Sequence, residues 1–213
     1  MKDIPIFDTE TGVSTLILKE IPYKQVAYVK LRSVQPDGLR EHLRECVSFC
    51  RMCGAERIFA EGHPELERWP EHCVVLKMNL AVTDREPPAM VFPVTEQTVG
   101  LWREIYNERM GPVDNSATMT ARDEKEILSS GGACFVHDGG VLLGIGWVKD
   151  SEILCVAAVQ PGAGERVLGT LLTLLNSDRA ELEVASTNHR AIRLYERMGF
   201  VTVGEKSKWY QIF

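Results

Sequence analysis

Two side chains near the C-terminal end of the chain have the types and the spacing to line one ligand cleft. Asn188 stands where an apolar-periodic segment begins, and its side-chain oxygen can accept backbone N–H bonds and cap a helix. Tyr195 lies two helical turns further along the same face. Between them, Ala191 is small enough for a ligand or a strand to approach closely. We favour a binding surface here; an amphipathic helix with an ordinary cap and stop is the alternative.

A glycine-rich turn before the preceding helix is the second candidate. Residues 161–164 read Pro-Gly-Ala-Gly, and backbone N–H groups in such a turn, with the N-terminus of the next helix, can hold a phosphate group. Arg166 can add positive charge, whereas Glu165 repels phosphate while favouring the helix dipole. A plain strand-to-helix turn is the alternative. A dinucleotide-binding fingerprint fits worse, because Gly162-x-Gly164 lacks a third glycine at the required spacing.

Histidines and cysteines gather between residues 42 and 73 and raise the question of a metal or redox site. They are His42, Cys46, Cys50, Cys53, His63, His72 and Cys73. One helix face presents two tetrahedral ligands easily but hardly four. The helix also needs Cys46 and Cys50 as part of its apolar face. We therefore expect core packing and no bound metal.

Composition and charge limit the classes of function. With 45% hydrophobic and 25% charged residues, the chain has the composition of a globular protein. Its net charge of -6 argues against a broad nucleic-acid-binding surface. No apolar run approaches the roughly 20 residues of a membrane span, and none follows Lys2 as in a signal peptide. We expect a cytoplasmic protein with free thiols and without a nucleic-acid or membrane partner.

The elements that position these residues fall into two groups, on either side of the charged, proline-containing stretch 84–88. Before it, the patterns predict strands at residues 15–20, 25–34, 57–60 and 73–82, a turn at residues 21–24, and a helix that begins after residues 36–38 and ends at Gly54. After it, they predict strands at residues 90–94, 133–137, 141–149, 152–159, 181–185, 200–204 and 208–213, and helices at residues 96–110, 120–129 and 188–198. A further helix is predicted after residues 161–164, with the apolar residues Val167, Leu168, Leu171, Leu172 and Leu175. We predict two domains, residues 1–86 and 89–213.

Residues 188–200 resemble a segment of the GNAT superfamily of N-acetyltransferases. They read Asn-His-Arg-Ala-Ile-Arg-Leu-Tyr-Glu-Arg-Met-Gly-Phe and match Asn-x-x-Ala-x-x-x-Tyr-x-x-x-Gly-Phe in register throughout. The order of elements from residue 90 onward is also that of the family. The turn before matches less well with the family's Val-x-Pro-x-x-[Arg/Gln]-x-x-Gly-x-[Gly/Ala]. Val159, Pro161 and Gly169 match, but Gly164 stands where Arg or Gln is usual and Val167 where the middle Gly is usual.

The resemblance implies an α/β (α+β) fold with a mixed, mostly antiparallel central sheet flanked by helices, preceded by a smaller α/β domain. It implies acetyl-CoA as cosubstrate, no metal, and direct acetyl transfer to a neutral amine, assisted by a backbone N–H of strand 152–159. Tyr195 matches the family's proton donor; Glu152 is the candidate base, and Glu183 is a comparable one. The cofactor-binding positions that the resemblance implies are Val159, Gly164, Arg166, Val167, Leu168, Gly169, Asn188 and Ala191.

We therefore expect an acetyl-CoA-dependent N-acetyltransferase acting on a primary amine of a small molecule or peptide, as a monomer or homodimer. The alternative is a non-catalytic acyl-CoA-binding or protein-interaction module on the same fold. The loop 111–121, with Asp114 and Asn115, is where relatives contact the acceptor, and a solvated loop is the other interpretation. Trp102 and Tyr106 are expected in the core. Residues 25–60 resemble the central strand–helix–strand of the same fold and suggest a degenerate, partial GNAT domain.

Overall fold

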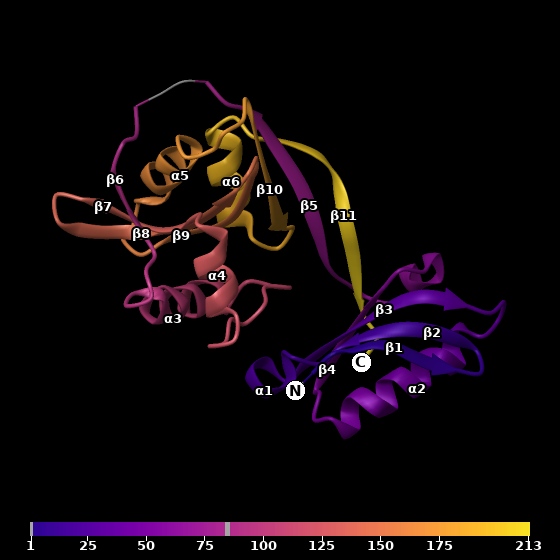
Figure 1. The fold of residues 1–213 in the computed structure, drawn as a ribbon. Coiled ribbons are helices and arrows are strands. Elements are labelled where there is room, and N and C mark those ends of the chain that lie inside the picture. Colours follow the sequence, from indigo (N-terminus) through magenta and orange to yellow (C-terminus); the bar gives the residue numbers. More distant parts are fainter. Residues whose placement is uncertain (1, 84–85) are drawn as a thin grey trace. The chain divides into compact units, whose positions relative to one another are not determined.

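The computed structural model describes residues 2–83 and 86–213 (Figure 1). Contacts divide the chain into two compact units: Met1–Val74 with Lys206–Phe213 form the first unit, and Val75–Glu205 form the second. Asp84 and Arg85 of the expected linker lie outside the described residues. The division into domains 1–86 and 89–213 stays a prediction. In the described part of the chain, no helix combines the length and the apolar character needed to cross a membrane.

The first unit is a sheet with one long helix. Its elements are β1 (Ile4–Thr9), β2 (Gly12–Ile17), α1 (Ile21–Lys24), β3 (Val26–Val34), α2 (Leu39–Met52), β4 (Arg57–Glu61), the 3-10 helix η1 (Pro64–Arg68) and the C-terminal part of β11 (Val201–Gln211). The strands are ordered β1-β2-β3-β4-β11. Strands β3 and β4 are parallel and joined by α2, whereas the other neighbours are antiparallel.

The apolar face of α2 explains the cysteines of this region. Cys46 and Cys50 are fully buried in the core of the first unit, as predicted. His42 is also fully buried, with Nδ1 2.8 Å from the Thr9 hydroxyl and Nε2 2.6 Å from the Ser14 hydroxyl. Burial lowers the pKa of His42, although nearby carboxylates oppose this shift. His42 therefore belongs to a closed, internally satisfied polar network.

The second unit is a larger sheet with helices on both faces. Its elements are β5 (Glu71–Ala81) from Val75 onward, β6 (Met90–Pro93), α3 (Val99–Met110), α4 (Glu124–Ser130), β7 (Ala133–Asp138), β8 (Val141–Lys149), β9 (Glu152–Ala158), α5 (Gly164–Leu172), β10 (Arg179–Ala185), α6 (His189–Arg197) and the first part of β11. The strands are ordered β5-β10-β9-β8-β7-β6. Only β9 and β10 are parallel among these pairs of described strands.

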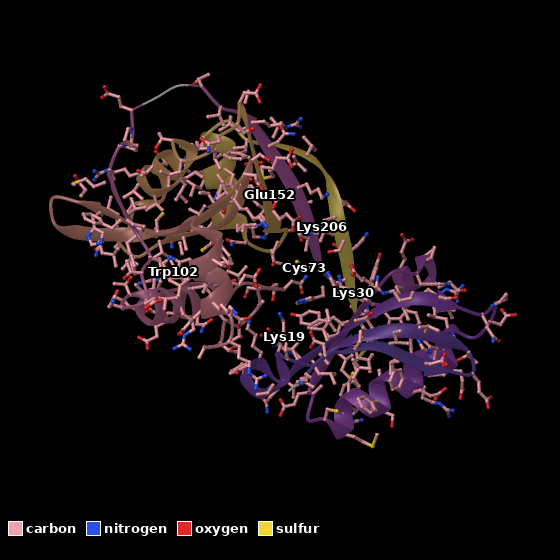
Figure 2. All side chains as sticks on the ribbon, in the orientation of Figure 1. Lys19, Lys30, Cys73, Trp102, Glu152 and Lys206 are labelled. Atoms are coloured by element: carbon pink, nitrogen blue, oxygen red, sulfur yellow. The ribbon has the colours of Figure 1, made fainter. Side chains whose placement is uncertain are left out.

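Two apolar clusters attach the helices to this sheet. Helices α5 and α6 pack on one face, where Val167, Leu168 and Tyr195 meet strand residues, and α3 and α4 pack on the other (Figure 1). Trp102 is fully buried and its indole N–H donates to the Cys134 carbonyl at 3.1 Å (Figure 2). Tyr106 is also buried beside it, and both are core residues as expected. The mixed, mostly antiparallel sheet flanked by helices is the predicted fold class.

The two units share an order of strands and exchange their last strands. Each unit has three consecutive antiparallel strands, β1-β2-β3 in the first and β7-β8-β9 in the second. A helix, α2 or α5, then leads to a strand parallel to the third one, β4 or β10. That strand pairs on its other side with an antiparallel strand, β11 or β5. The strand that follows β4 in the chain thus pairs with β10, and the strand that follows β10 pairs with β4. Each sheet is completed by a segment that follows the other.

One strand was not foreseen, and two local predictions were wrong. Strand β1 was not predicted, and residues 21–24 form the short helix α1 instead of a turn. Residues 200–204 and 208–213, predicted as two strands, belong largely to one strand, β11. Gly204 is not one of the described glycines with a positive φ. The chain therefore stays extended through it and the strand continues.

Candidate functional site

The parallel pair β9 and β10 is joined over a short length only. Glu152 pairs with Glu181 and Ile153 with Leu182, and within the described residues the pairing stops there. Strand β9 nevertheless continues to Ala158. Its second half therefore borders an opening on the side where β10 would otherwise lie.

A β-bulge lies where this pairing stops. Along β8, Trp147 faces Cys155 and the next residue, Val148, faces Ile153, so Leu154 is an extra residue in β9. A bulge bends a strand and increases its twist. The bulge at Leu154 is therefore a physical reason for the separation of β9 from β10.

The backbone of β9 offers donors to this opening. The Val159 N–H donates to the Leu143 carbonyl at 2.8 Å and so points toward β8. Because successive residues of an antiparallel ladder point their N–H groups to opposite sides, those of Val156 and Ala158 point away from β8. Both residues line the cavity described next.

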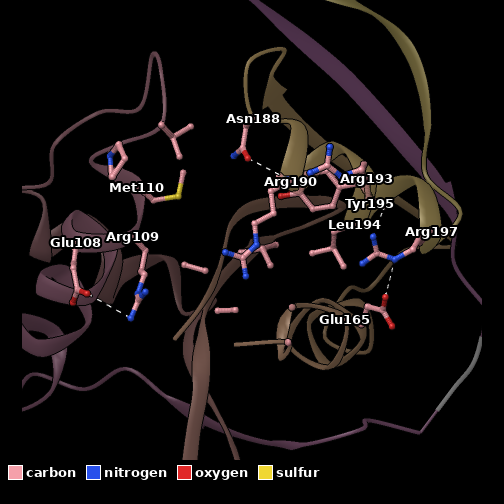
Figure 3. Close-up of a pocket in the computed structure, with 18 residues that line it drawn as sticks. Glu108, Arg109, Met110, Glu165, Asn188, Arg190, Arg193, Leu194, Tyr195 and Arg197 are labelled. Carbon is pink, nitrogen blue, oxygen red and sulfur yellow. Dashed lines mark hydrogen bonds and ion pairs between the residues drawn. The ribbon is translucent and has the colours of Figure 1, made fainter. Parts of the chain in front are cut away.

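A cavity of about 570 Å³ occupies this side of β9 (Figure 3). Its walls are the end of α3 with the residues after it, the second half of β9, the glycine-rich turn with the start of α5, and one face of α6. All of these belong to the second unit. The two candidate regions identified from the sequence therefore meet at one cavity.

Helix α6 is positioned as its sequence predicts. Asn188 Oδ1 accepts the Ala191 N–H at 3.1 Å and caps the helix. Asn188, Ala191 and Tyr195 all line the cavity. Tyr195 is buried, and burial raises the pKa of its phenol well above the ordinary value of 10.0, with Cys155 adding to the shift. Tyr195 is therefore a neutral proton-bearing group at physiological pH.

The turn before α5 supplies backbone rather than side chains. Gly162 has φ +79°, which favours glycine, and Gly164 begins α5 beside the cavity. A Cβ on Gly164 would stand 3.0 Å from Leu194 Cδ2, so the two helices approach closely there. The first N–H groups of α5 have no partner within the helix. These backbone N–H groups can bind an anion even though Gly164 brings no positively charged side chain to the turn.

The remaining predicted cofactor positions take other places. The side chains of Val167 and Leu168 are fully buried in the core, and Gly169 packs against Pro88. Arg166 makes a 2.7 Å ion pair with Asp138 and donates to the Pro88 carbonyl at 3.2 Å. Neither these four residues nor Val159 line the cavity.

The sequence prediction missed the arginines of this site. Arg109, Arg190, Arg193 and Arg197 line the cavity, against two carboxylates, Glu108 and Glu165. The signal on α6 was available, since residues 190, 193 and 197 recur at helical spacing along one face. Arg109 comes from α3, and only the tertiary fold brings it to this place.

Both carboxylates of the cavity are paired with arginines. Glu165 Oε1 lies 3.0 Å from Arg197 Nε, and Glu108 Oε1 lies 3.5 Å from Arg109 Nη2 (Figure 3). The Arg190 and Arg193 guanidinium groups have no ion pair among the described residues. The cavity is therefore a positively charged site in an acidic chain.

The candidate bases lie outside the cavity lining. Glu152 is exposed at the start of β9 (Figure 2), four residues before Val156, and Glu183 is exposed on β10. At about 3.3 Å per residue, Glu152 lies on the order of 13 Å along the strand from Val156. A base role for either residue stays a prediction.

The loop after α3 is held toward α6. Asp114 Oδ2 accepts the Thr187 hydroxyl at 2.7 Å, next to the cap of α6. Asn115 has φ +58°, and its side-chain amide N and O are buried without a hydrogen-bond partner in the described part of the chain. Asn115 is not among the residues that line the cavity, and these two atoms are shielded from solvent. No group of three or more potential metal ligands occurs among residues 2–83 and 86–213.

Comparisons with known proteins bear on the fold. No protein-family model matches the chain, and no curated protein matches it by sequence. Several solved structures, however, match its fold. A GCN5-related N-acetyltransferase from Sphaerobacter thermophilus is 14% identical, with TM-score 0.57 over 94% of this chain and 76% of that one.

The chain has a GNAT fold.

Two more GNAT-like structures agree. A putative acetyltransferase from Pyrococcus horikoshii is 16% identical, with TM-score 0.58 over 95% of this chain and 70% of that one. An acetyltransferase of the GNAT family from Colwellia psychrerythraea is 12% identical, with TM-score 0.52 over 97% and 84%. At these identities the likeness concerns the GNAT fold, and the chemistry must be argued from the site itself.

Proposed function

We propose that this GNAT-fold protein transfers the acetyl group of acetyl-CoA to a primary amine of a small molecule or peptide. The observation that carries the proposal is the cavity where β9 leaves β10, lined by unpaired backbone on one side and by arginines on the other. The acetyltransferase descriptions of the structural neighbours support it.

The residues of the cavity fit a ligand with a thioester arm and a diphosphate. Positive charge gathers from α3 and α6, and the N-terminus of α5 opens onto the same space. Val156 and Ala158 give the opposite wall an extended backbone against which an amide-containing arm can lie. Gly162 leaves the turn free of any side chain that would fill this space.

Acetyl-CoA would supply an activated acetyl group as its thioester. The Val156 N–H, which points away from β8, is placed to stabilise negative charge on a carbonyl oxygen. The Tyr195 hydroxyl, kept protonated by burial, can give its proton to a leaving thiolate. The amine must lose its proton before it attacks.

A non-catalytic acyl-CoA-binding or interaction module is the second candidate. It is favoured by the absence of Glu152 and Glu183 from the cavity lining, because no carboxylate other than Glu108 and Glu165 borders the described cavity and both are paired. The two candidates predict the same ligand but different turnover.

Calorimetry with acetyl-CoA, followed by a thiol-release assay over a panel of amines, tests the proposal. We expect binding and amine-dependent release of CoA thiol. Binding without turnover on any amine would favour the module, and failure of the wild-type chain to bind acetyl-CoA would reject both. The Tyr195→Phe variant, which should bind but turn over slowly, serves as the matched control for chemistry as opposed to binding.

A further inference from the structure

The glycine-rich turn contains no positively charged side chain. Its last residue is Gly164, and the nearest cation in sequence, Arg166, is held by Asp138 at 2.7 Å and by the Pro88 carbonyl. Arg166 does not line the cavity. A phosphate group at the start of α5 must therefore find its cations on other elements.

Arg109 is one such cation. Its Nη2 lies 3.4 Å from the Val159 carbonyl, so the guanidinium stands where β9 gives way to the glycine-rich turn. Its other contact, with Glu108, is long at 3.5 Å, and the Glu108 side chain is 68% exposed. An exposed pair of this length binds Arg109 weakly. The guanidinium can therefore turn its N–H groups to a ligand at small cost.

Arg190 is the second cation that a phosphate group at the start of α5 can reach from another element. It extends from the first turn of α6 into the cavity, on the side opposite Arg109 (Figure 3). No hydrogen bond or ion pair joins its guanidinium to any other described residue. Arg197, by contrast, is committed to Glu165 and to the Arg193 carbonyl. Arg190 thus brings an uncompensated charge to the space that Arg109 faces from the other wall.

We propose that Arg109 and Arg190 together hold the diphosphate of the CoA ligand, in place of a cationic side chain in the turn. Each guanidinium presents parallel N–H donors that match phosphate oxygens. Two such groups from opposite walls suit a linear diphosphate better than a single phosphate. The inference rests on the proposed function, because it assumes that CoA is the ligand.

The test measures binding, not turnover. Arg109→Gln, Arg190→Gln and the double variant are titrated calorimetrically with CoA and with dephospho-CoA, which keeps the diphosphate and lacks the 3′-phosphate. Since a hydrogen bond to a charged group contributes about 1.5–3 kcal/mol, each single variant should bind about tenfold or more weakly. The loss should be equal for the two ligands. Arg122→Gln removes an exposed charge of the same unit outside the cavity lining and should change neither affinity.

The outcomes separate the inference from the function on which it rests. A wild-type chain that binds neither ligand refutes the proposed function. Wild-type binding with unchanged affinity in both single variants refutes only the arginine pair. A loss seen with CoA but not with dephospho-CoA assigns the arginines to the 3′-phosphate and also refutes it. Arg109→Lys and Arg190→Lys, which keep the charge without the planar fork, should recover part of the affinity and show that loss of folding is not the cause.

Discussion

The ion pair between Glu165 and Arg197 should control how well the cavity accepts an anion. Glu165 lies in the first turn of α5, where its charge favours the helix dipole but opposes a phosphate at the same N-terminus. Arg197 Nε, 3.0 Å away, neutralises it. Removing Arg197 therefore uncovers a carboxylate in the lining of the cavity, and the Arg197→Gln variant should bind CoA more weakly than the wild type.

The size of the effect follows from the exposure of the pair. For unit charges about 6 Å apart, effective dielectric constants of roughly 20 to 80 give about 2.8 to 0.7 kcal/mol. The two side chains are 59% and 55% exposed, so the lower part of that range applies. A change of about 1 kcal/mol corresponds to about fivefold in affinity. The effect on folding stability should stay below about 1 kcal/mol, because exposed ion pairs contribute little.

A double-mutant cycle checks this reasoning by calorimetry with CoA at low and high salt. Glu165→Gln alone should strengthen binding about fivefold, and the double variant, whose net charge equals that of the wild type, should bind about as the wild type does. The differences should shrink at high salt. A double variant as weak as Arg197→Gln would show that Arg197 contacts the ligand itself and that relief from Glu165 is not its role.

The other predictions concern chemistry, pH and packing. Tyr195→Phe should lower kcat about 100-fold or more while CoA affinity stays within about twofold, measured by thiol release and calorimetry; full turnover at every pH would exclude the acid role. Because burial lowers the pKa of His42 below its ordinary 6.5, the unfolded state binds its proton first as pH falls, so stability should be constant above about pH 6.5 and decrease below it. Urea unfolding at pH 7.5 and 5.5 measures this, and an equal decrease in His42→Gln would assign it to other groups. Gly144→Ala should cost about 1–3 kcal/mol, since its Cβ would meet the Ala157 carbonyl oxygen at 2.4 Å. Gly204→Ala, also in a strand, with open space at Cβ and no positive φ, is the control by which thermal unfolding separates this clash from loss of glycine alone.

Much of the fold could be predicted because local patterns and tertiary structure agree. The helical period of α2, α5 and α6 and the apolar strands of the second unit each specify one element. The predictions failed where a glycine or proline does not do what it does most often. Gly204 continues a strand, and Pro22 starts the short helix α1, where its missing N–H has no cost.

The site could be predicted only in part. That Asn188, Ala191 and Tyr195 line one cavity could be predicted, because they lie on one helix face whose geometry is fixed by sequence spacing. Arg166 was expected near phosphate from its sequence position, but the hairpin between β7 and β8 brings Asp138 to it. Arg109 could not be found, since its place beside Val159 depends on the packing of α3 against the sheet.

The exchange of last strands has a consequence for synthesis of the chain. Residues 60 and 210 pair in the first unit, so its sheet stays incomplete until residue 210, some 150 residues later, has been translated. Until then β4 presents an unpaired edge, which is a template for association with other chains. Folding must also close long loops before these contacts form, which slows it. A fragment of residues 89–213, lacking β5, would keep the cavity residues but leave the edge of β10 open, and we expect it to aggregate unless residues 71–81 are supplied.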